Sequence, residues 1–219
     1  PKILVTGACG QVGTELVAVM RQKYGVENVI ASDIIRKPAS FPEGPFRYAN
    51  VLEYSTMEKL VVENQITWLI HLTGILSATG EKNLQLAFDV NVNGAKNALD
   101  LARNHNLRIF APSSIAAFGP STPRDFTPND TIMRPSTIYG VTKVFLELLG
   151  EYYHSKFGVD FRSLRYPGII SPGLPGGGTT DYAIHIFYAA LKEGKYNCFL
   201  REDSALPMMY MPDCLKSTL

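Results

Sequence analysis

The sequence of 219 residues lacks the features that mark several specialised classes of protein. Its 3 cysteines show neither the spacing of metal ligands nor the pattern of a disulfide framework. No apolar run approaches the roughly 18 residues of a membrane span, and no signal-peptide pattern is visible. A formal net charge of +1 gives no electrostatic reason to expect nucleic acid or an anionic membrane as a partner. We therefore expect neither a secreted nor a membrane protein, and no metal site.

The composition is that of an ordinary protein with a hydrophobic core. Hydrophobic residues make up 46% of the chain and charged residues 19%, as in many globular domains. The length suits one generous domain, or one domain and a fragment of another. No internal repeat or low-complexity linker divides the sequence.

Predicted strands and helices alternate along the chain, and residues 3–5 form a uniformly apolar strand of the kind that is buried on both faces. The predicted strands are 3–5, 28–33, 46–51, 68–72, 108–111 and 161–165. The predicted helices cover about 12–24, 55–61, 84–104, 136–157 and 181–191, and Ser55-Thr56-Met57-Glu58 is predicted to form a capping box at the start of the second. This order predicts an α/β fold, a Rossmann-type doubly wound parallel sheet with helices on both faces. Ligands of such sheets bind beyond the carboxyl ends of the strands.

The first strand leads into a glycine-rich turn that indicates a dinucleotide site. Gly7, Gly10 and Gly13 let the backbone turn tightly and approach a ligand closely, and the next helix presents free N–H groups to a pyrophosphate. Glycine punctuates many turns, so this pattern alone is weak. Asp33, however, ends the second strand 20 positions after Gly13, where such units place the acceptor of the ribose 2′-OH. A simple helix-capping turn would leave that spacing unexplained.

A second group of residues indicates hydride-transfer chemistry. Tyr139 and Lys143 are four positions apart on a predicted helix and therefore share a face. A free tyrosine, with a pKa of about 10, is a poor base near neutral pH, and a nearby ammonium favours its phenolate form. Ser114, at the end of the fifth strand, is placed to hydrogen-bond the same substrate oxygen. Beside a nucleotide-binding turn, this set predicts the oxidation of a hydroxyl by a nicotinamide cofactor.

Several motifs together resemble the extended short-chain dehydrogenase/reductases, the group that includes nucleotide-sugar epimerases. They are Thr6-Gly7-x-x-Gly10-x-x-Gly13, Asp33, Asn91-Val92-x-Gly94, Ser114, Tyr139-x-x-x-Lys143 and Arg165-Tyr166-Pro167. Longer segments are similar to the short-chain type of L-threonine 3-dehydrogenase within that group. These segments are 76–83, 138–143, 165–171, 175–182 and 207–211. The resemblance covers essentially the whole chain, and residues 175–182, the glycine–threonine segment, are its most specific part.

The resemblance implies oxidation of the β-hydroxyl of L-threonine to 2-amino-3-oxobutanoate, with NAD as the hydride acceptor. Tyr139 would take the hydroxyl proton, Lys143 would hold the nicotinamide ribose and Ser114 would orient the hydroxyl. The residues expected around NAD are Gly7, Gly10, Gln11, Val12, Gly13, Ser32, Asp33, Ile34, Asn50, Val51, Leu72, Tyr139, Lys143 and Ile169. Those expected around threonine are Ser77, Ser114, Tyr139, Thr179 and Thr180.

Simpler interpretations exist for some of these residues. Thr179 or Thr180 could instead cap the helix that begins near Asp181. Ser77 could make only a local bond within a turn. His71, at a strand end, is interpreted as a buried core histidine rather than a catalyst.

The sequence leaves two other functions open. A nucleotide-sugar epimerase or dehydratase shares Ser114, Tyr139 and Lys143, but those enzymes need a large pocket in a C-terminal lobe and lack the glycine–threonine segment. A non-catalytic NAD-binding or interaction module is the alternative outside the enzymes, because the chain looks short. A rise in NADH absorbance with threonine and NAD would separate a threonine dehydrogenase from an epimerase or dehydratase.

The resemblance also implies how the chain is organised. We expect an NAD-binding domain over residues 1–172, with residues 173–219 supplying elements of a small substrate lobe interleaved with it. Because members of the family continue further, we expect only the root of that lobe here, with poor closure over threonine. Residues 84–104 and 136–157 keep apolar side chains over a wide helix face and are expected to form a homodimer interface. The expected compartment is the bacterial cytoplasm or the mitochondrial matrix.

Asp33 predicts a preference for NAD over NADP. Its carboxylate accepts a hydrogen bond from the ribose 2′-OH of NAD and repels the 2′-phosphate of NADP. Arg36 and Lys37 follow the strand end and soften this preference without replacing the acid. Calorimetric titration is expected to show that NAD binds at least about tenfold more tightly than NADP. Asp33→Asn is expected to reduce this difference in affinity. Equal affinities in the unaltered protein would contradict the prediction.

Overall fold

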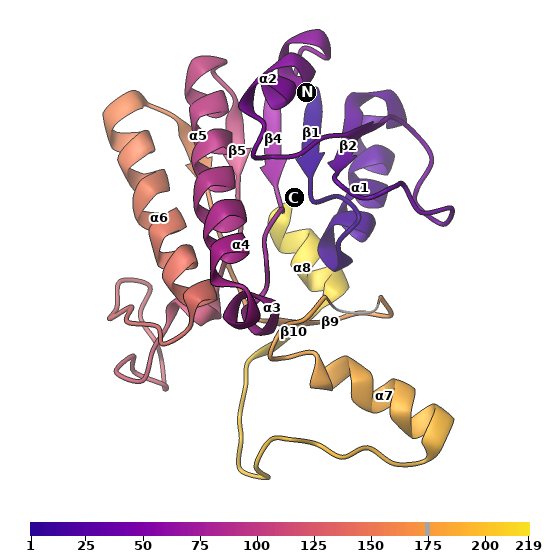
Figure 1. Ribbon diagram of the computed structural model, residues 1–219, viewed down its shortest axis with the longest axis vertical. Helices are drawn as coiled ribbons and strands as arrows, with labels where there is room; N and C mark the ends of the chain where they lie inside the picture. The colour runs from indigo at the N-terminus through magenta and orange to yellow at the C-terminus, as the bar shows by residue number, and fades with distance from the viewer. Residues whose placement is uncertain (174–175) are drawn as a thin grey trace.

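The structure, a computed structural model, describes residues 1–173 and 176–219. Its centre is a parallel sheet of six strands in the order β3-β2-β1-β4-β5-β7 (Figure 1). The strands are β1 (Ile3–Thr6), β2 (Val29–Asp33), β3 (Phe46–Tyr48), β4 (Trp68–His71), β5 (Arg108–Phe110) and β7 (Asp160–Arg162). The chain winds outward from β1 to β3 and then crosses back to β4, so the strand order reverses between β1 and β4. This doubly wound sheet confirms the predicted α/β fold.

Two hydrophobic clusters cover the two faces of the sheet. Leu4 points into one cluster, whereas Ile3 and Val5 point into the other, because successive side chains of a strand face opposite sides. The Leu4 face is covered by α2 (Tyr54–Glu63), α5 (Ala95–Asn104) and α6 (Ile138–Phe157), and the other by α1 (Gln11–Tyr24) and α8 (Met211–Thr218). Burial on both faces explains why the strand sequences are continuously apolar. No helix in the described residues has the length and apolarity needed to cross a membrane.

The chain beyond β7 leaves the main sheet and returns to it only at its end. β8 (Arg165–Tyr166) pairs with β6 (Ser113–Ser114), and β9 (Gly168–Ile170) pairs with β10 (Met208–Tyr210). Between β9 and β10, α7 (Tyr182–Glu193) and the residues after it project from the rest of the molecule (Figure 1). α8 then packs Met211 and Cys214 into the cluster around β1. Pro175, the first residue of the glycine–threonine segment, lies outside the described residues.

Two predicted details are wrong, and long-range or turn contacts explain both. The capping box at Ser55 does not form, because Glu53 occupies the N-cap position and α2 begins at Tyr54. A turn in which the Glu53 N–H donates to the Asn50 carbonyl at 3.0 Å leads the chain into the helix early. The predicted strand 161–165 is divided into β7 and β8, because Arg165 leaves the main sheet to pair with β6.

The two long helices that border the site form close to their predicted positions. Residues 84–104 are continuously helical, but α4 (Leu84–Phe88) and α5 are joined by a π-helical turn over Asp89–Gly94. α6 begins two positions later than predicted, after Thr137, whose Oγ1 accepts from the Gly140 N–H at 3.1 Å. Midway along α6, Gly150 lies so close to β7 that a Cβ there would overlap the Phe161 ring. At this point α6 therefore packs directly against the Phe161 side chain of β7.

Candidate active site

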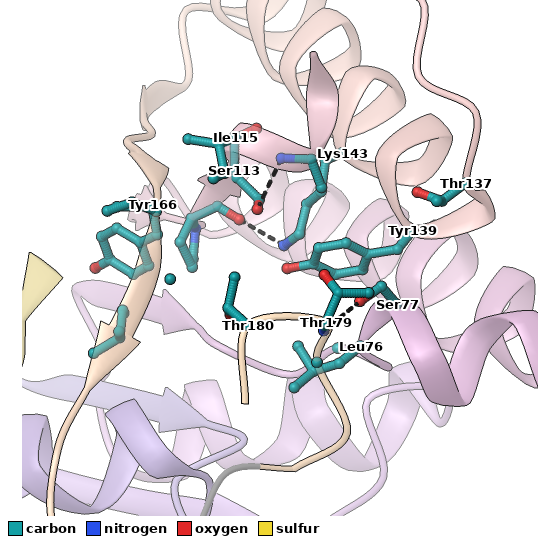
Figure 2. A pocket seen from close by; sticks show the side chains of 18 of the residues that line it. Leu76, Ser77, Ser113, Ile115, Thr137, Tyr139, Lys143, Tyr166, Thr179 and Thr180 are labelled. Carbon is teal, nitrogen blue, oxygen red and sulfur yellow. Dashed lines mark hydrogen bonds between the residues drawn. The ribbon is translucent and has the colours of Figure 1, made fainter. Parts of the chain in front are cut away.

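A cavity of about 390 Å³ lies at the carboxyl end of the sheet, where ligands bind in doubly wound folds (Figure 2). Ten predicted residues line it: Gln11, Val12, Leu72, Ser77, Ser114, Tyr139, Lys143, Ile169, Thr179 and Thr180. The lining does not include Gly7, Gly10, Gly13, Ser32, Asp33, Ile34, Asn50 or Val51. Within the described residues, no group of His, Cys, Asp and Glu side chains is arranged to hold a metal ion.

The glycine turn is pressed against the loop that follows β4. Gly7 has a φ of +66°, and a Cβ on it would lie 2.7 Å from the Thr73 backbone nitrogen. A Cβ on Gly13 would lie 2.5 Å from the Gly7 carbonyl oxygen. Gly10 occupies the N-cap of α1 and offers no side chain to the first helical N–H groups. The turn therefore leaves bare backbone donors at a helix start, as an anion such as a pyrophosphate requires.

Asp33 lies beside this turn, at the end of β2. Its Oδ2 accepts from the Cys9 N–H at 2.9 Å, and its Oδ1 accepts from the Ile34 N–H at 2.8 Å. Burial, and then the Asp33 charge, raises the pKa of the Cys9 thiol to about 11, so this cysteine stays protonated and unreactive at neutral pH. Ser32 is buried and its carbonyl accepts from the Ala8 N–H at 3.1 Å, whereas Ile34 is exposed. The carboxylate is thus fixed at the rim of the turn.

Asn50 and Val51 lie in the turn between β3 and α2. The Asn50 side-chain oxygen accepts from the Leu52 N–H at 3.0 Å. The Val51 side chain is buried in the core, and its carbonyl accepts from the Asn97 side-chain amide at 3.0 Å. A ligand next to this turn would therefore meet the backbone of Val51 rather than its side chain.

Tyr139 and Lys143 reach the cavity from the first turns of α6, side by side (Figure 2). The Lys143 Nζ lies 5.4 Å from the Tyr139 ring centroid and donates to the Pro112 carbonyl at 2.6 Å. Ser114 comes from the end of β6, and its Oγ accepts from the Ala116 N–H at 3.2 Å. Tyr139, Lys143 and Ser114, the three predicted reacting residues, therefore line one cavity.

His71 lies behind this part of the cavity and is not among its lining residues. The side chain is buried, and its Nδ1 is 3.0 Å from the Thr6 Oγ1. Burial, and to a smaller extent the Lys143 charge, lowers the pKa of His71 to about 4. A neutral, hydrogen-bonded ring confirms the interpretation of His71 as a core histidine.

Ser77 and the glycine–threonine segment bound another side of the cavity (Figure 2). Ser77 begins α3 (Ser77–Lys82), and its Oγ accepts from the Thr179 N–H at 3.2 Å, so its bond is not local. The Asp181 Oδ2 accepts from the Gly177 N–H at 2.9 Å and from the Gly178 N–H at 2.8 Å, and these bonds hold the segment in a turn. Asp181 is the residue that precedes α7, and it makes no side-chain cap bond. The helix-capping interpretation of Thr179 and Thr180 is therefore wrong.

Two side chains tie the cavity together in ways that sequence reasoning missed. The Asn91 amide accepts from the Ile75 N–H at 2.7 Å and donates to the Thr142 Oγ1 at 3.2 Å, which joins the loop after β4 to α6. The Gln11 side chain donates to the Ile169 carbonyl at 3.2 Å, which joins the glycine turn to β9. An asparagine inside a helical pattern was the available signal for Asn91, since such a residue needs a partner there. Nothing in the sequence pointed to the Gln11 contact.

The sequence profile of the NAD dependent epimerase/dehydratase family matches residues 3–215 of the chain. The chain belongs to this family. Among curated relatives, this family member is 53% identical to the mitochondrial L-threonine 3-dehydrogenase of Bos taurus and 52% identical to that of Sus scrofa. Both alignments cover 100% of this chain and 59% of the relative. The chain thus spans about three fifths of the length of these relatives.

Solved structures show the same relationship. The L-threonine dehydrogenase of Phytophthora infestans superposes with a TM-score of 0.96 at 57% identity, covering 100% of this chain and 70% of that one. The L-threonine 3-dehydrogenase of Trypanosoma brucei gives 0.95 at 51% identity, covering 99% and 69%. The UDP-glucose 4-epimerase of Thermotoga maritima gives 0.88 at 19% identity, which shows a likeness of fold alone.

Acid is expected to destabilise this family member through His71. Its pKa is about 4 in the folded state and about 6.5 when unfolded, so between these values only the unfolded chain binds the proton. The stability from neutral His71 is complete above about pH 6.5 and falls by about 3 kcal/mol as the pH drops to about 4. Urea unfolding at pH 7 and pH 4.5 measures this loss. His71→Gln is expected to reduce it, and the exposed His185→Gln is not; equal losses in both variants would contradict the prediction.

Proposed function

We propose that the protein oxidises the β-hydroxyl of L-threonine to 2-amino-3-oxobutanoate, with NAD as the hydride acceptor. The observation that carries this proposal is a single cavity that unites Tyr139 and Lys143 with Ser77 and Thr179. The first pair suits removal of a proton from a hydroxyl, and the second offers polar groups to an amino acid. The relatives that are 53% and 57% identical are an L-threonine 3-dehydrogenase and an L-threonine dehydrogenase, which supports the same substrate for this chain.

The residues around the glycine turn fit NAD. A Cβ on Gly7 or Gly13 would fill the space within the turn. Without it, the turn leaves backbone N–H donors for the pyrophosphate. Asp33 is fixed where it can accept from the adenosine ribose, and Leu72 and Ile169 give the cavity apolar walls that suit the nicotinamide. The chemistry that NAD supplies when bound is acceptance of the hydride from the carbon that carries the hydroxyl.

Tyr139, Lys143 and Ser114 have separate tasks in this proposal. Tyr139 removes the hydroxyl proton, and Lys143 places a positive charge beside the tyrosine ring. The Pro112 carbonyl holds the Lys143 ammonium, so the charge does not swing away from the cavity. Ser114 accepts from the Ala116 N–H, which leaves its own hydrogen for the substrate oxygen.

Ser77, Thr179 and Thr180 bind the amino-acid end of the substrate. The Ser77 Oγ accepts from the Thr179 N–H, so the serine hydrogen can be donated to the threonine carboxylate. The hydroxyls of Thr179 and Thr180, both in the cavity lining, add groups that donate to the carboxylate and accept from the ammonium. Because these residues line the same cavity as Tyr139, they would hold the amino acid's charged groups while Tyr139 contacts its reacting hydroxyl (Figure 2).

Tyr139→Phe tests the assignment of the base. The variant keeps the ring but loses the hydroxyl, so threonine-dependent NADH formation is expected to fall by about 100-fold or more, with NAD affinity unchanged. Tyr24→Phe is the control, because Tyr24 packs against Trp68 away from the cavity. Turnover of Tyr139→Phe close to that of the unaltered protein would place the base elsewhere. If the unaltered protein forms no NADH from threonine, the proposed oxidation is wrong and NAD binding without catalysis is the function that is left.

We also propose that two copies of the chain associate through α4, α5 and α6. Apolar side chains are exposed on α4 at Leu84, Leu86 and Phe88, and on α6 at Val141, Leu148, Tyr152 and Phe157. α4 and α6 are in contact, so two neighbouring helices both expose apolar side chains, which water solvates poorly. Homodimer interfaces are typically more apolar than the rest of a protein's surface, and a two-fold pair buries the same patch on both copies.

Light scattering after size exclusion is expected to give the mass of a dimer at micromolar concentration. Leu148→Glu introduces a charge at a side chain that is 56% exposed on α6, and it is expected to give a monomer. Leu191→Glu changes an 87% exposed leucine of α7 and is expected to leave the dimer intact. A 46% identical L-threonine 3-dehydrogenase from a metagenome is described as monomeric. A monomeric mass for the unaltered protein would show that this chain behaves in the same way.

A further inference from the structure

We propose that Glu147 is a positioning residue that fixes Ser114 and one wall of the cavity through Ser113 and Arg165. The inference rests on the proposed function, in which Ser114 orients the substrate hydroxyl. Its basis is a buried charged network that lies directly behind the cavity and takes no part in the chemistry described above.

Glu147 follows Lys143 by one helical turn on α6, so both side chains leave the same face of the helix. The residue is 7% exposed, although it is a carboxylate. It accepts from the Arg165 Nε at 2.9 Å and from the Arg165 Nη2 at 2.7 Å, and the Ser113 Oγ donates to it as well. The carboxylate therefore clamps two residues that pair across β6 and β8.

The clamp secures a strand pair that is weak by itself. β6 and β8 are joined over only two residue pairs, Ser113 with Arg165 and Ser114 with Tyr166, and so short a ladder gives little stability alone. Because one carboxylate holds both Ser113 and Arg165, the two strands cannot slide or rotate independently. Ser114 is the next residue after the clamped Ser113, so its direction into the cavity is set by the same contact.

The Arg165 side chain extends the clamp to the loop over residues 118–137. Its guanidinium lies 5.3 Å from the Phe118 ring centroid, and its Nη1 donates to the Asn129 carbonyl at 2.7 Å. Phe118 lines the cavity. The hydrogen bond to Glu147 raises the pKa of Arg165, so the cation that holds the loop is always charged. Through Ser113 and Arg165, the Glu147 carboxylate therefore fixes both the Ser114 hydroxyl and the apolar wall of the cavity at Phe118.

Stability alone is a poor explanation for this network. Desolvation of two charges offsets most of their attraction, and apolar side chains of similar volume often stabilise a core as well or better. A bidentate carboxylate–guanidinium pair instead gives fixed geometry, because both groups are planar and the two bonds are parallel. Geometry of that kind is what a substrate-orienting hydroxyl needs, since misplacement by about 1 Å can cost about 100-fold in rate.

Glu147→Gln tests the inference with the smallest change of shape. It removes the charge that holds Arg165 and is expected to lower kcat for threonine by about 10- to 100-fold, with NAD affinity within about twofold of the parent. Asp160→Asn is the matched control, because it breaks an exposed ion pair of Asp160 with Arg162 on the adjacent β7. All assays are made well below the measured unfolding temperature of each variant, so a loss of kcat with intact NAD binding separates positioning from unfolding.

Hydrogen exchange followed by mass spectrometry gives a second readout that needs no turnover. Glu147→Gln is expected to speed exchange over residues 113–119 and 127–135 and to leave exchange in the central strands β1 and β4 unchanged. Asp160→Asn is expected to leave exchange unchanged in all of these segments. Arg165→Lys keeps the charge but loses the planar fork, and it is expected to show the same pattern should Glu147→Gln fail to fold. Unchanged kcat together with unchanged exchange in these segments would overturn the inference. An inactive parent whose variant shows the faster exchange would instead overturn the proposed function alone.

Discussion

The contact between the glycine turn and the loop after β4 is the constraint on which the cavity depends. Gly7 and Gly13 leave no room for a side chain against Thr73 and against each other, so the backbone segments after β1 and β4 touch directly. These are the two strands between which the sheet order reverses, and connections that depart to opposite faces open a crevice at such a point. Gln11 and Val12, at the start of the helix that follows the turn, line the cavity that opens there.

α6 supplies the reacting groups, and it is tied to its surroundings at nearly every turn. Gly140 lies directly against the Ala116 carbonyl, where a Cβ would overlap it. Thr142 bonds Asn91 of the π-helical turn, Lys143 bonds Pro112, and Glu147 bonds the residue just before Ser114. These contacts join the helix to residues 112–116 and to the π-helical turn over Asp89–Gly94. Tyr139 is therefore held by the whole frame, and a preorganised frame is what efficient proton and hydride transfer requires.

The fold and the central site residues were predictable because their signals are local. Strand runs, the glycine spacing, Asp33 and the Tyr139/Lys143 pair depend on residues a few positions apart, or on one βαβ unit. The false cap at Ser55 shows the limit of that approach, since a turn just upstream decided where the helix began. The contacts of Arg165 could not be predicted, for a different reason. Its partners lie far away in sequence, and no local pattern states which strand a residue will join.

Gly150 bears on how this protein can be engineered. Replacing a glycine inside a helix by alanine usually raises the free energy of unfolding by about 0.5–1 kcal/mol. Alanine reduces the conformational freedom of the unfolded chain and has the higher helix propensity. Here the added methyl group would collide with the Phe161 ring and push the middle of α6 away from β7. The same helix carries Tyr139 and Lys143, so a routine thermostabilising exchange would shift the reacting groups as well. Gly158, at the helix end, imposes no such spatial limit, because a methyl group there would meet nothing within 4 Å, although its φ of +71° still favours glycine.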